Sequence, residues 1–104
     1  MPILNVKLSS PASVALSRKV ADTLSALSTR LLGKDPRVTS IAIDFVSPAH
    51  WYIGGKPLSE QGVESFFFDI RITDETNTKA EKAAFVAEAY AALCQLLGPV
   101  HEES

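Results

Sequence analysis

Two long helical patterns, each behind a strand pattern and each stopped by glycine and proline, constrain the fold of this chain most. The first carries apolar residues at spacings of three and four, which form one core-facing stripe: Leu16, Val20, Leu24, Leu27 and Leu31. Gly33 is expected to cap this helix in the left-handed conformation, and Pro36 prevents the helix from resuming. The second pattern runs to Leu97 and is stopped by Gly98 and Pro99. Such a chain is built from repeated strand–helix units.

The strand patterns lie before and between these helices. Apolar and polar residues alternate over 2–8, with Leu4, Val6 and Leu8 on one face, and this period of two predicts a strand. β-Branched residues are frequent over 38–46 and an apolar run covers 65–73, so both segments are predicted strands. Between them, the Gly54-Gly55 pair predicts the turn of a short hairpin.

The helix starts also carry local signals. Ser10 is expected to be the N-cap of the first helix, with Pro11 at the first helical position. Thr78 and Glu81 have the spacing of a capping box and predict the start of the second helix. The packed face of that helix is expected to carry Val86, Ala89, Leu93 and Leu96.

The element order predicts an α/β (α+β) fold in one domain over 1–104. Tandem β-α-β units would form one mixed four-stranded sheet with two helices packed on one face. The first unit covers about 2–46, the hairpin about 47–58 and the second β-α unit about 64–98. The first two strands should be parallel because one long helix joins them. The chain ends where a last strand should start, so either the chain continues or a partner covers the open edge.

Composition excludes several classes of protein. Ten basic and twelve acidic residues give a net charge of −2, whereas nucleic-acid binders usually carry a basic surplus. The chain lacks the apolar run of about 18 residues that a membrane span needs, and it lacks a leader pattern, so we expect a soluble cytoplasmic protein. The single cysteine, Cys94, is expected to be a buried apolar residue. His50 and His101 lack a third metal ligand at useful spacing, so no metal is expected.

The run Phe66-Phe67-Phe68 predicts an oligomer. Three adjacent rings fall on both faces of one strand, and the two helices can cover only one of these faces. Burial of the other face would need another subunit.

Pro2 is the strongest candidate for chemistry. A small residue behind the initiator Met1 normally permits its removal, which would leave Pro2 with a free secondary amine. An α-amino group titrates at about 7.7–8.0, and burial or a nearby cation lowers that pKa. Such an amine is suited to act as a general base near neutral pH. The alternative is an ordinary proline at the first position of a strand.

Three segments resemble the tautomerase superfamily, which includes 4-oxalocrotonate tautomerase and macrophage migration inhibitory factor. They are 2–6, 33–36 followed by 41–43, and the aromatic-then-Ile-Gly-Gly stretch 49–55. The resemblance implies that the amine of Pro2 moves a proton next to a carbonyl, without a cofactor. It also implies a trimer with sites at the subunit boundaries. The oxalocrotonate enzyme has arginines where this chain has Ala12 and Ala42.

The resemblance also suggests roles for further residues. Lys34 is a catalytic candidate, as a cation that would lower the pKa of the Pro2 amine and hold a carboxylate. Alternatively, its charge only interacts favourably with the dipole at the C-terminus of the first helix. Trp51 is a candidate pocket wall, or else a core or interface ring. Arg71, with its neighbour Ile70, is a candidate for substrate binding, although Arg71 could simply pair with Asp69 on the strand face.

These residues support three hypotheses of function. The first is cofactor-independent keto–enol tautomerisation of a small carboxylated substrate, with Pro2 as base. The second keeps this base in a dehalogenase, hydratase or decarboxylase of short keto or unsaturated acids, with Asp69 and Arg71 as helpers. The third is a non-catalytic oligomeric binding protein.

Overall fold

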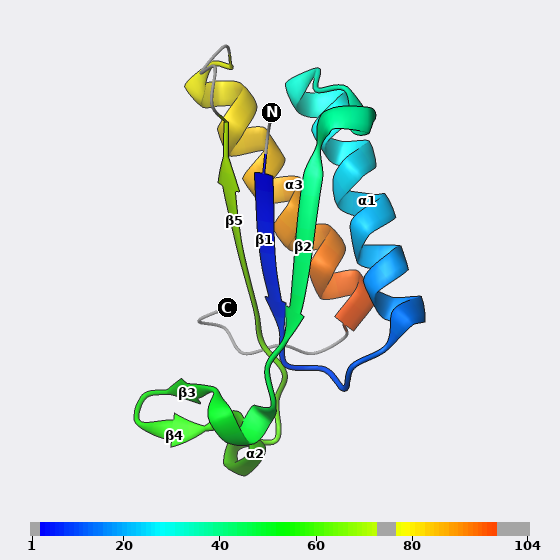
Figure 1. The fold of residues 1–104 in the computed structure, drawn as a ribbon. Helices are drawn as coiled ribbons and strands as arrows, with labels where there is room; N and C mark the ends of the chain where they lie inside the picture. The colour runs from blue at the N-terminus through cyan, green and yellow to red at the C-terminus, as the bar shows by residue number, and fades with distance from the viewer. Residues whose placement is uncertain (1–2, 73–76, 98–104) are drawn as a thin grey trace.

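The computed structural model describes residues 3–72 and 77–97. Figure 1 shows a long sheet against two long helices, with a small hairpin beyond one end of the sheet. The elements are β1 (Ile3–Leu8), α1 (Val14–Leu32), η1 (Pro36–Val38), β2 (Ser40–Phe45), η2 (Pro48–His50), β3 (Tyr52–Ile53), β4 (Lys56–Pro57), α2 (Leu58–Gln61), β5 (Phe66–Arg71) and α3 (Lys79–Leu97). No helix in these ranges has the length and apolar character needed to cross a membrane.

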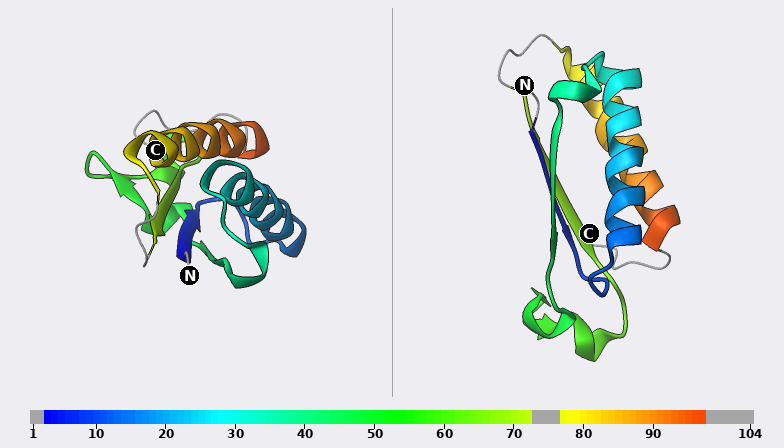
Figure 2. Two further views of the ribbon diagram at one scale, coloured as in Figure 1. Left: turned by 90° about the horizontal axis from the view of Figure 1, so that it is seen from above. Right: turned by 45° about the vertical axis from the view of Figure 1, so that its right-hand side comes forward.

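The strands form a mixed sheet in the order β2-β1-β5. β1 is parallel to β2, as predicted, and antiparallel to β5. Both long helices cover one face of this sheet, which Figure 2 shows from the side, so the predicted fold class is confirmed. One detail differs: β3 and β4 pair with each other in a separate two-stranded sheet. The predicted last strand would fall beyond Leu97, outside the described residues.

The core lies between the sheet and the helices. Leu4, Val6 and Leu8 are buried, as their alternation predicts. The other large contributors are Val20 and Leu24 of α1, Phe66 of β5, and Phe85 and Leu93 of α3. The predicted stripe on α3 was wrong at Val86, which is 46% exposed, because Phe85 occupies the core in its place. Alanines surround both positions, so the pattern did not select between them, and the larger ring buries more apolar surface.

The helix ends follow local hydrogen bonding. Gly33 caps α1 with φ 66°, as predicted. The capping box of α3 is confirmed, because Thr78 N–H donates to Glu81 Oε1 at 2.8 Å and Glu81 N–H donates to Thr78 Oγ1 at 3.1 Å. The start of α1 was predicted wrongly: its N-cap is Ser13, whose Oγ accepts from Leu16 N–H. Either serine can cap a helix, so residue type alone did not choose between them.

The predicted hairpin is present between 52 and 57. Gly54 and Gly55 have φ of 66° and 81°, so both central residues of the turn lie in the left-handed region. A two-residue turn with this geometry requires residues that tolerate positive φ, which is why the glycine pair predicts it.

The outer face of the sheet is not buried within one chain. The three adjacent rings predicted that both faces of β5 are buried. Phe67 is 51% exposed on the outer face, so a single copy of the chain does not bury it. Asp69 and Arg71 continue the same face of β5, and Asn5 and Lys7 occupy it on β1. The face also carries the apolar residues Ile3 of β1 and Ala42 of β2, and burial of the Phe67 ring would need a partner.

Candidate functional site

The sheet end at which β1 begins is the candidate site. Ile3, the first described residue, is the register partner of Ser40 at the start of β2 and of Arg71 at the end of β5. β1 is the central strand, so its first residue is flanked on both sides. Pro2 precedes Ile3 in the sequence and lies outside the described residues. The start of α3 lies at this same end in Figure 1.

A hollow of about 300 Å³ opens at this end of the molecule. Its lining residues are Ile70, Arg71 and Ile72 from the end of β5, and Lys82 from the second turn of α3. Two of the three predicted substrate-binding residues, the consecutive residues Ile70 and Arg71, line this hollow, and the third, Trp51, does not. The structure adds Lys82, which sequence reasoning missed.

The hollow is cationic. The Nε of Arg71 donates to Asp69 Oδ2 at 3.4 Å, and both side chains are well exposed, so this pair contributes little stability. Within 3–72 and 77–97, no hydrogen bond or ion pair involves the ammonium of Lys82. No sequence signal marks Lys82, because Lys79 carries the same charge nearer the start of the same helix.

Lys34 lies at the junction of α1 and α3. It follows the Gly33 cap, is partly buried, and donates its backbone N–H to Ser28 O at 3.4 Å. The backbone N–H of Thr78 holds the pKa of the Glu81 carboxyl below its usual value, and the charge of Lys34 nearby also lowers it. Lys34 is therefore beside the start of α3, but it does not line the hollow with Arg71 and Lys82.

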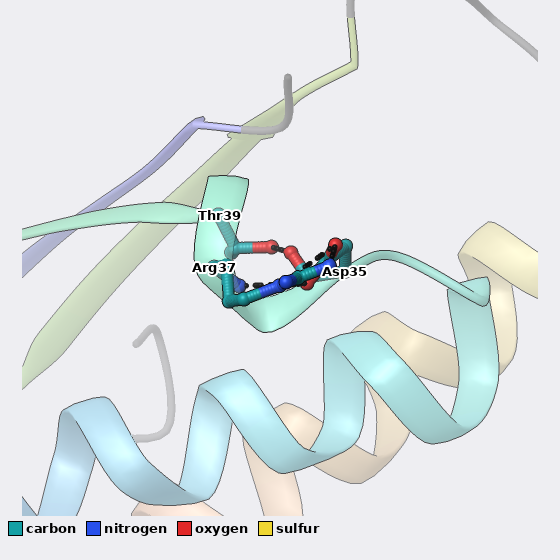
Figure 3. Close-up of polar contacts among 3 residues, drawn as sticks. All are labelled: Asp35, Arg37 and Thr39. Carbon is teal, nitrogen blue, oxygen red and sulfur yellow. Dashed lines mark hydrogen bonds and ion pairs between the residues drawn. The ribbon is translucent and has the colours of Figure 1, made fainter.

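A polar turn connects Lys34 to β2 (Figure 3). Asp35 accepts from the backbone N–H of Arg37 and from its Nη2, both at 2.9 Å, and Thr39 Oγ1 donates to Asp35 O at 2.9 Å. The Arg37 guanidinium holds the pKa of the Asp35 carboxyl below its usual range, and Asp35 raises the pKa of Arg37. These contacts fix the chain on both sides of η1, which sets the position of Lys34 relative to the first residue of β2.

Trp51 lies at the other end of the sheet. Together with His50, Tyr52 and Phe67, it lines a second hollow, which Lys7 also contacts. Lys7 is four residues along β1 from Ile3, a distance of about 13 Å at the usual rise of a strand. Within one chain, therefore, Trp51 is not brought to the Ile3 end. It also lines a groove beside β5 that reaches Ile70.

The remaining residues considered from the sequence are Cys94 and His50. Cys94 is partly buried beside the core, close to the expectation for a small apolar residue. His50 ends the short turn η2, in a segment that connects β2 to β3. In 3–72 and 77–97, no group of three or more His, Cys, Asp or Glu residues is placed to hold a metal ion.

Comparison with solved structures identifies the fold. The structure of Pt0534 inactivated by 2-oxo-3-pentynoate has a TM-score of 0.80 at 11% identity, over 94% of this chain and 76% of that one. The wild-type R7 fused 4-OT asymmetric trimer has a TM-score of 0.76 at 20% sequence identity, over 95% of this chain and 76% of that one. The macrophage migration inhibitory factor-like protein from Entamoeba histolytica has a TM-score of 0.72 at 19% sequence identity, over 95% of this chain and 78% of that one. No protein-family model and no curated protein matches the chain.

The likeness covers nearly the whole chain, while the identities are low. Identities of 11–20% show the fold alone. The chain therefore has the fold of the tautomerase superfamily, and the resemblance expected from its sequence is confirmed at the level of the fold.

Proposed function

We propose that the chain is an isomerase of the tautomerase superfamily that uses Pro2 as a general base. Its reaction is the keto–enol tautomerisation of a small carboxylated substrate. The observation that carries the proposal is the position of Ile3 at the start of the central strand, at the cationic end of the sheet. Removal of Met1 would leave Pro2, the residue bonded to Ile3, with a free secondary amine.

Covalent geometry limits how far this amine can be from the cations. Antiparallel partners such as Ile3 and Arg71 have Cα atoms about 5 Å apart, and the proposed amine belongs to the residue that is covalently bonded to Ile3. Nearby cations disfavour the protonated amine and lower its pKa. A neutral amine at pH 7 can accept a proton directly.

The chemistry then needs only one base and a charge partner. The lone pair of the amine takes a proton from the carbon next to the substrate carbonyl, and the electrons of that C–H bond move to the carbonyl oxygen as an enolate. The protonated amine returns the proton to another atom of the enolate, which gives the other tautomer. A cation, either Arg71 at the hollow or Lys34 beside the start of α3, would hold the carboxylate or stabilise the enolate.

An oligomer would complete the pocket. Trp51 lies far from Ile3 in one chain, and Phe67 is half exposed beside it, so the aromatic end of one copy is suited to cover the Ile3 end of another. The R7 fused 4-OT structure is a trimer. We therefore propose a homotrimer with sites between copies. The cytoplasmic location stays a prediction.

The test is a ketonisation assay with phenylenolpyruvate. We expect intact-mass analysis to find Met1 removed, and the native protein to exceed the buffer rate. Pro2→Ala leaves a primary amine in place of the secondary one and should lower the rate, whereas Pro2→Leu, which should retain Met1 and so displace the amine, should lower it by a factor of about 100 or more, the usual range for loss of a general base. Pro11→Ala, which changes an exposed proline elsewhere, should leave the rate unchanged. Equal rates for native and Pro2→Leu protein, or Met1 retained in the native protein, would reject the proposal.

One observation favours the second candidate, a proline-dependent hydratase, dehalogenase or decarboxylase. Asp69 lies on the same face of β5 as Arg71 with Oδ2 3.4 Å from Nε, so a carboxylate able to activate water adjoins a cation able to bind an acid. A product screen with 3-chloroacrylate and malonate semialdehyde separates the two candidates. Turnover of either compound without ketonisation would favour the second.

A further inference from the structure

β5 is an edge strand of the sheet that the structure describes. The strand order is β2-β1-β5, so within 3–72 and 77–97 only one side of β5 is paired, the side that faces β1. A groove follows the other side, and its lining includes every residue of 65–70 and, from α3, Val86 and Tyr90. Successive residues of a strand point to opposite faces, so a groove lined by consecutive residues runs along the strand edge. Such an open edge can pair with a further strand.

The hydrogen bonds between β1 and β5 determine which backbone groups face the open edge. Ser9 N–H donates to Ser65 O at 3.2 Å, one step beyond the register of the two strands, so Ser9 and Ser65 form a bonded position. Bonded positions alternate with non-bonded ones in an antiparallel pair. The odd-numbered residues of β5 are therefore bonded to β1. The N–H and C=O groups of the even-numbered residues, such as Phe68 and Ile70, point toward the open edge.

Charge selects how a second copy of β5 would pair with this edge. A two-fold axis normal to the sheet makes two copies of β5 antiparallel, and only registers that place even-numbered residues opposite each other bring outward backbone groups together. One such register places Ile70 opposite the Ile70 of the second copy. Asp69 of each copy then lies opposite Arg71 of the other, on the outer face of the sheet. The neighbouring permitted registers place Asp69 opposite Asp69 or Arg71 opposite Arg71, and like charges directly opposite each other are destabilising.

Asp69 and Arg71 are placed to make these contacts. Arg71 Nε donates to Asp69 Oδ2 of the same chain at 3.4 Å, and the side chains of Arg71 and Asp69 are 78% and 41% exposed. In the described ranges the terminal nitrogens of Arg71 make no hydrogen bond, so they can bond a second carboxylate. Phe68 and Ile72 pack toward the core, on the helix side. The same register places Phe68 opposite Ile72 of the second copy, and such aromatic and β-branched pairs stabilise antiparallel strands.

We propose that the open edge of β5 binds the same edge of a second copy of this chain, with reciprocal Asp69–Arg71 ion pairs around a two-fold axis at Ile70. The contact goes beyond the proposed function, because it requires no turnover and is separate from the trimer contact at Trp51. Pairing engages Arg71, which leaves Lys34 as the cation available to a substrate. The contact covers only about residues 68–72, so pairing should be weak and should increase with protein concentration.

The test is the molar mass of the protein, measured by sedimentation over a range of concentrations. The native mass should rise toward twice the value found in dilute solution. Asp69→Arg and Arg71→Asp each place like charges at both contacts, so each variant alone should need at least about tenfold higher concentration to pair. An equimolar mixture of the two variants should pair at least as well as the native protein, because every contact between them joins opposite charges. Asp44→Arg, an equal charge reversal on the other edge strand, β2, should pair like the native protein.

Hydrogen exchange tests the same edge at single residues. The amides of Phe68 and Ile70 should exchange rapidly in dilute protein and several-fold more slowly as pairs form. The amides of Phe67 and Asp69 are bonded to β1 and should stay protected at every concentration, so they serve as the internal control. Protection of Phe68 and Ile70 in dilute protein would show that something other than a second copy occupies the edge, and would overturn the proposal.

Three results of the mass measurement would also overturn the proposal: a native mass that does not change with concentration, single variants that pair like the native protein, or a mixture of the two variants that fails to pair. Circular dichroism and the melting temperature of each variant separate a loss of pairing from a loss of folding. None of these measurements depends on catalysis. A failed tautomerase assay would therefore reject the proposed function and leave this contact standing.

Discussion

The backbone N–H of Ser65 donates a 2.8 Å hydrogen bond to the Oγ of Ser9, and the N–H of Ser9 donates to Ser65 O at 3.2 Å. Both residues are 1% exposed. This reciprocal pair continues the antiparallel pairing of β1 and β5 one step past Leu8 and Phe66. It therefore holds the two strands together at the end opposite the candidate site.

Replacing Ser9 by Ala should destabilise the protein by about 1–2 kcal/mol. The variant removes the buried acceptor used by the Ser65 N–H, and loss of a buried hydrogen-bond partner costs about that much. Urea denaturation followed by circular dichroism measures the change. Ser59→Ala, at an exposed position, should change the stability by less than about 0.5 kcal/mol. Equal midpoints for the two variants would contradict a structural role for this pair.

The turn at Asp35 should show a measurable pH signature. Hydrogen bonds from Arg37 lower the pKa of the folded Asp35 carboxyl, so the interaction stabilises the fold above the ordinary carboxyl pKa and is lost as pH falls through the folded value. An NMR titration should give Asp35 a midpoint below 3.8, the usual value for this group. Arg37→Gln should move that midpoint upwards. An unchanged midpoint in this variant would show that the guanidinium is not the cause.

Local sequence signals predicted the parts of this fold that depend on local interactions. Gly33 and the Thr78–Glu81 capping box act within one turn of a helix, so their residue types are enough to predict where each helix ends or begins. The choice of Ser13 over Ser10 depends on where the chain leaves β1, and Ser10 bonds Glu64, 54 residues away, instead. The selection of Phe85 over Val86 likewise depends on how α3 lies on the sheet.

The candidate site was predictable only where one strand carries it. Ile70 and Arg71 are adjacent on β5, so a strand pattern could mark both. Lys82 joins them through packing of α3 against the end of β5, for which spacing in the sequence offers no guide. The distance of Trp51 from Ile3 follows from the sheet direction and from the hairpin lying beyond its end, and a resemblance between short segments does not contain that information.

A reactive keto acid should mark the N-terminus. Pt0534 has been seen inactivated by 2-oxo-3-pentynoate, whose alkyne is conjugated to a carbonyl. A neutral Pro2 amine would form an N–C bond at the alkyne carbon farther from the carbonyl, while its proton passes to the nearer carbon. Mass spectrometry should find one added reagent molecule, located on the N-terminal peptide, with parallel loss of activity.

Pro2→Leu provides the control for this labelling. A large second residue should retain Met1, which moves the amine by one residue, so we expect neither label nor activity. Modification of Cys94 or of a lysine at the same rate as the N-terminal peptide would contradict a selectively reactive amine.

Subunit mixing tests whether the site is shared between copies. Trp51→Ala should lower activity about tenfold or more, although in one chain Trp51 lies near Lys7 at the far end of β1. Pro2→Leu should also be nearly inactive, because its retained Met1 displaces the amine. If Trp51 of one copy covers the Ile3 end of another, unfolding and refolding the two variants together creates some sites with both native residues. Activity should then exceed that of either variant alone.

The mixing result depends on association, so the oligomeric state is measured alongside by light scattering, with a trimer expected. Trp51→Ala protein that is unfolded and refolded alone is the control for the refolding step, and its activity should not increase. If mixed trimers form and show no recovery, Trp51 acts within its own chain or only in packing, because a site shared between neighbours must regain both native residues in some arrangements. Recovery in the mixed sample alone can arise only when residues from opposite ends of two different sheets meet in one pocket.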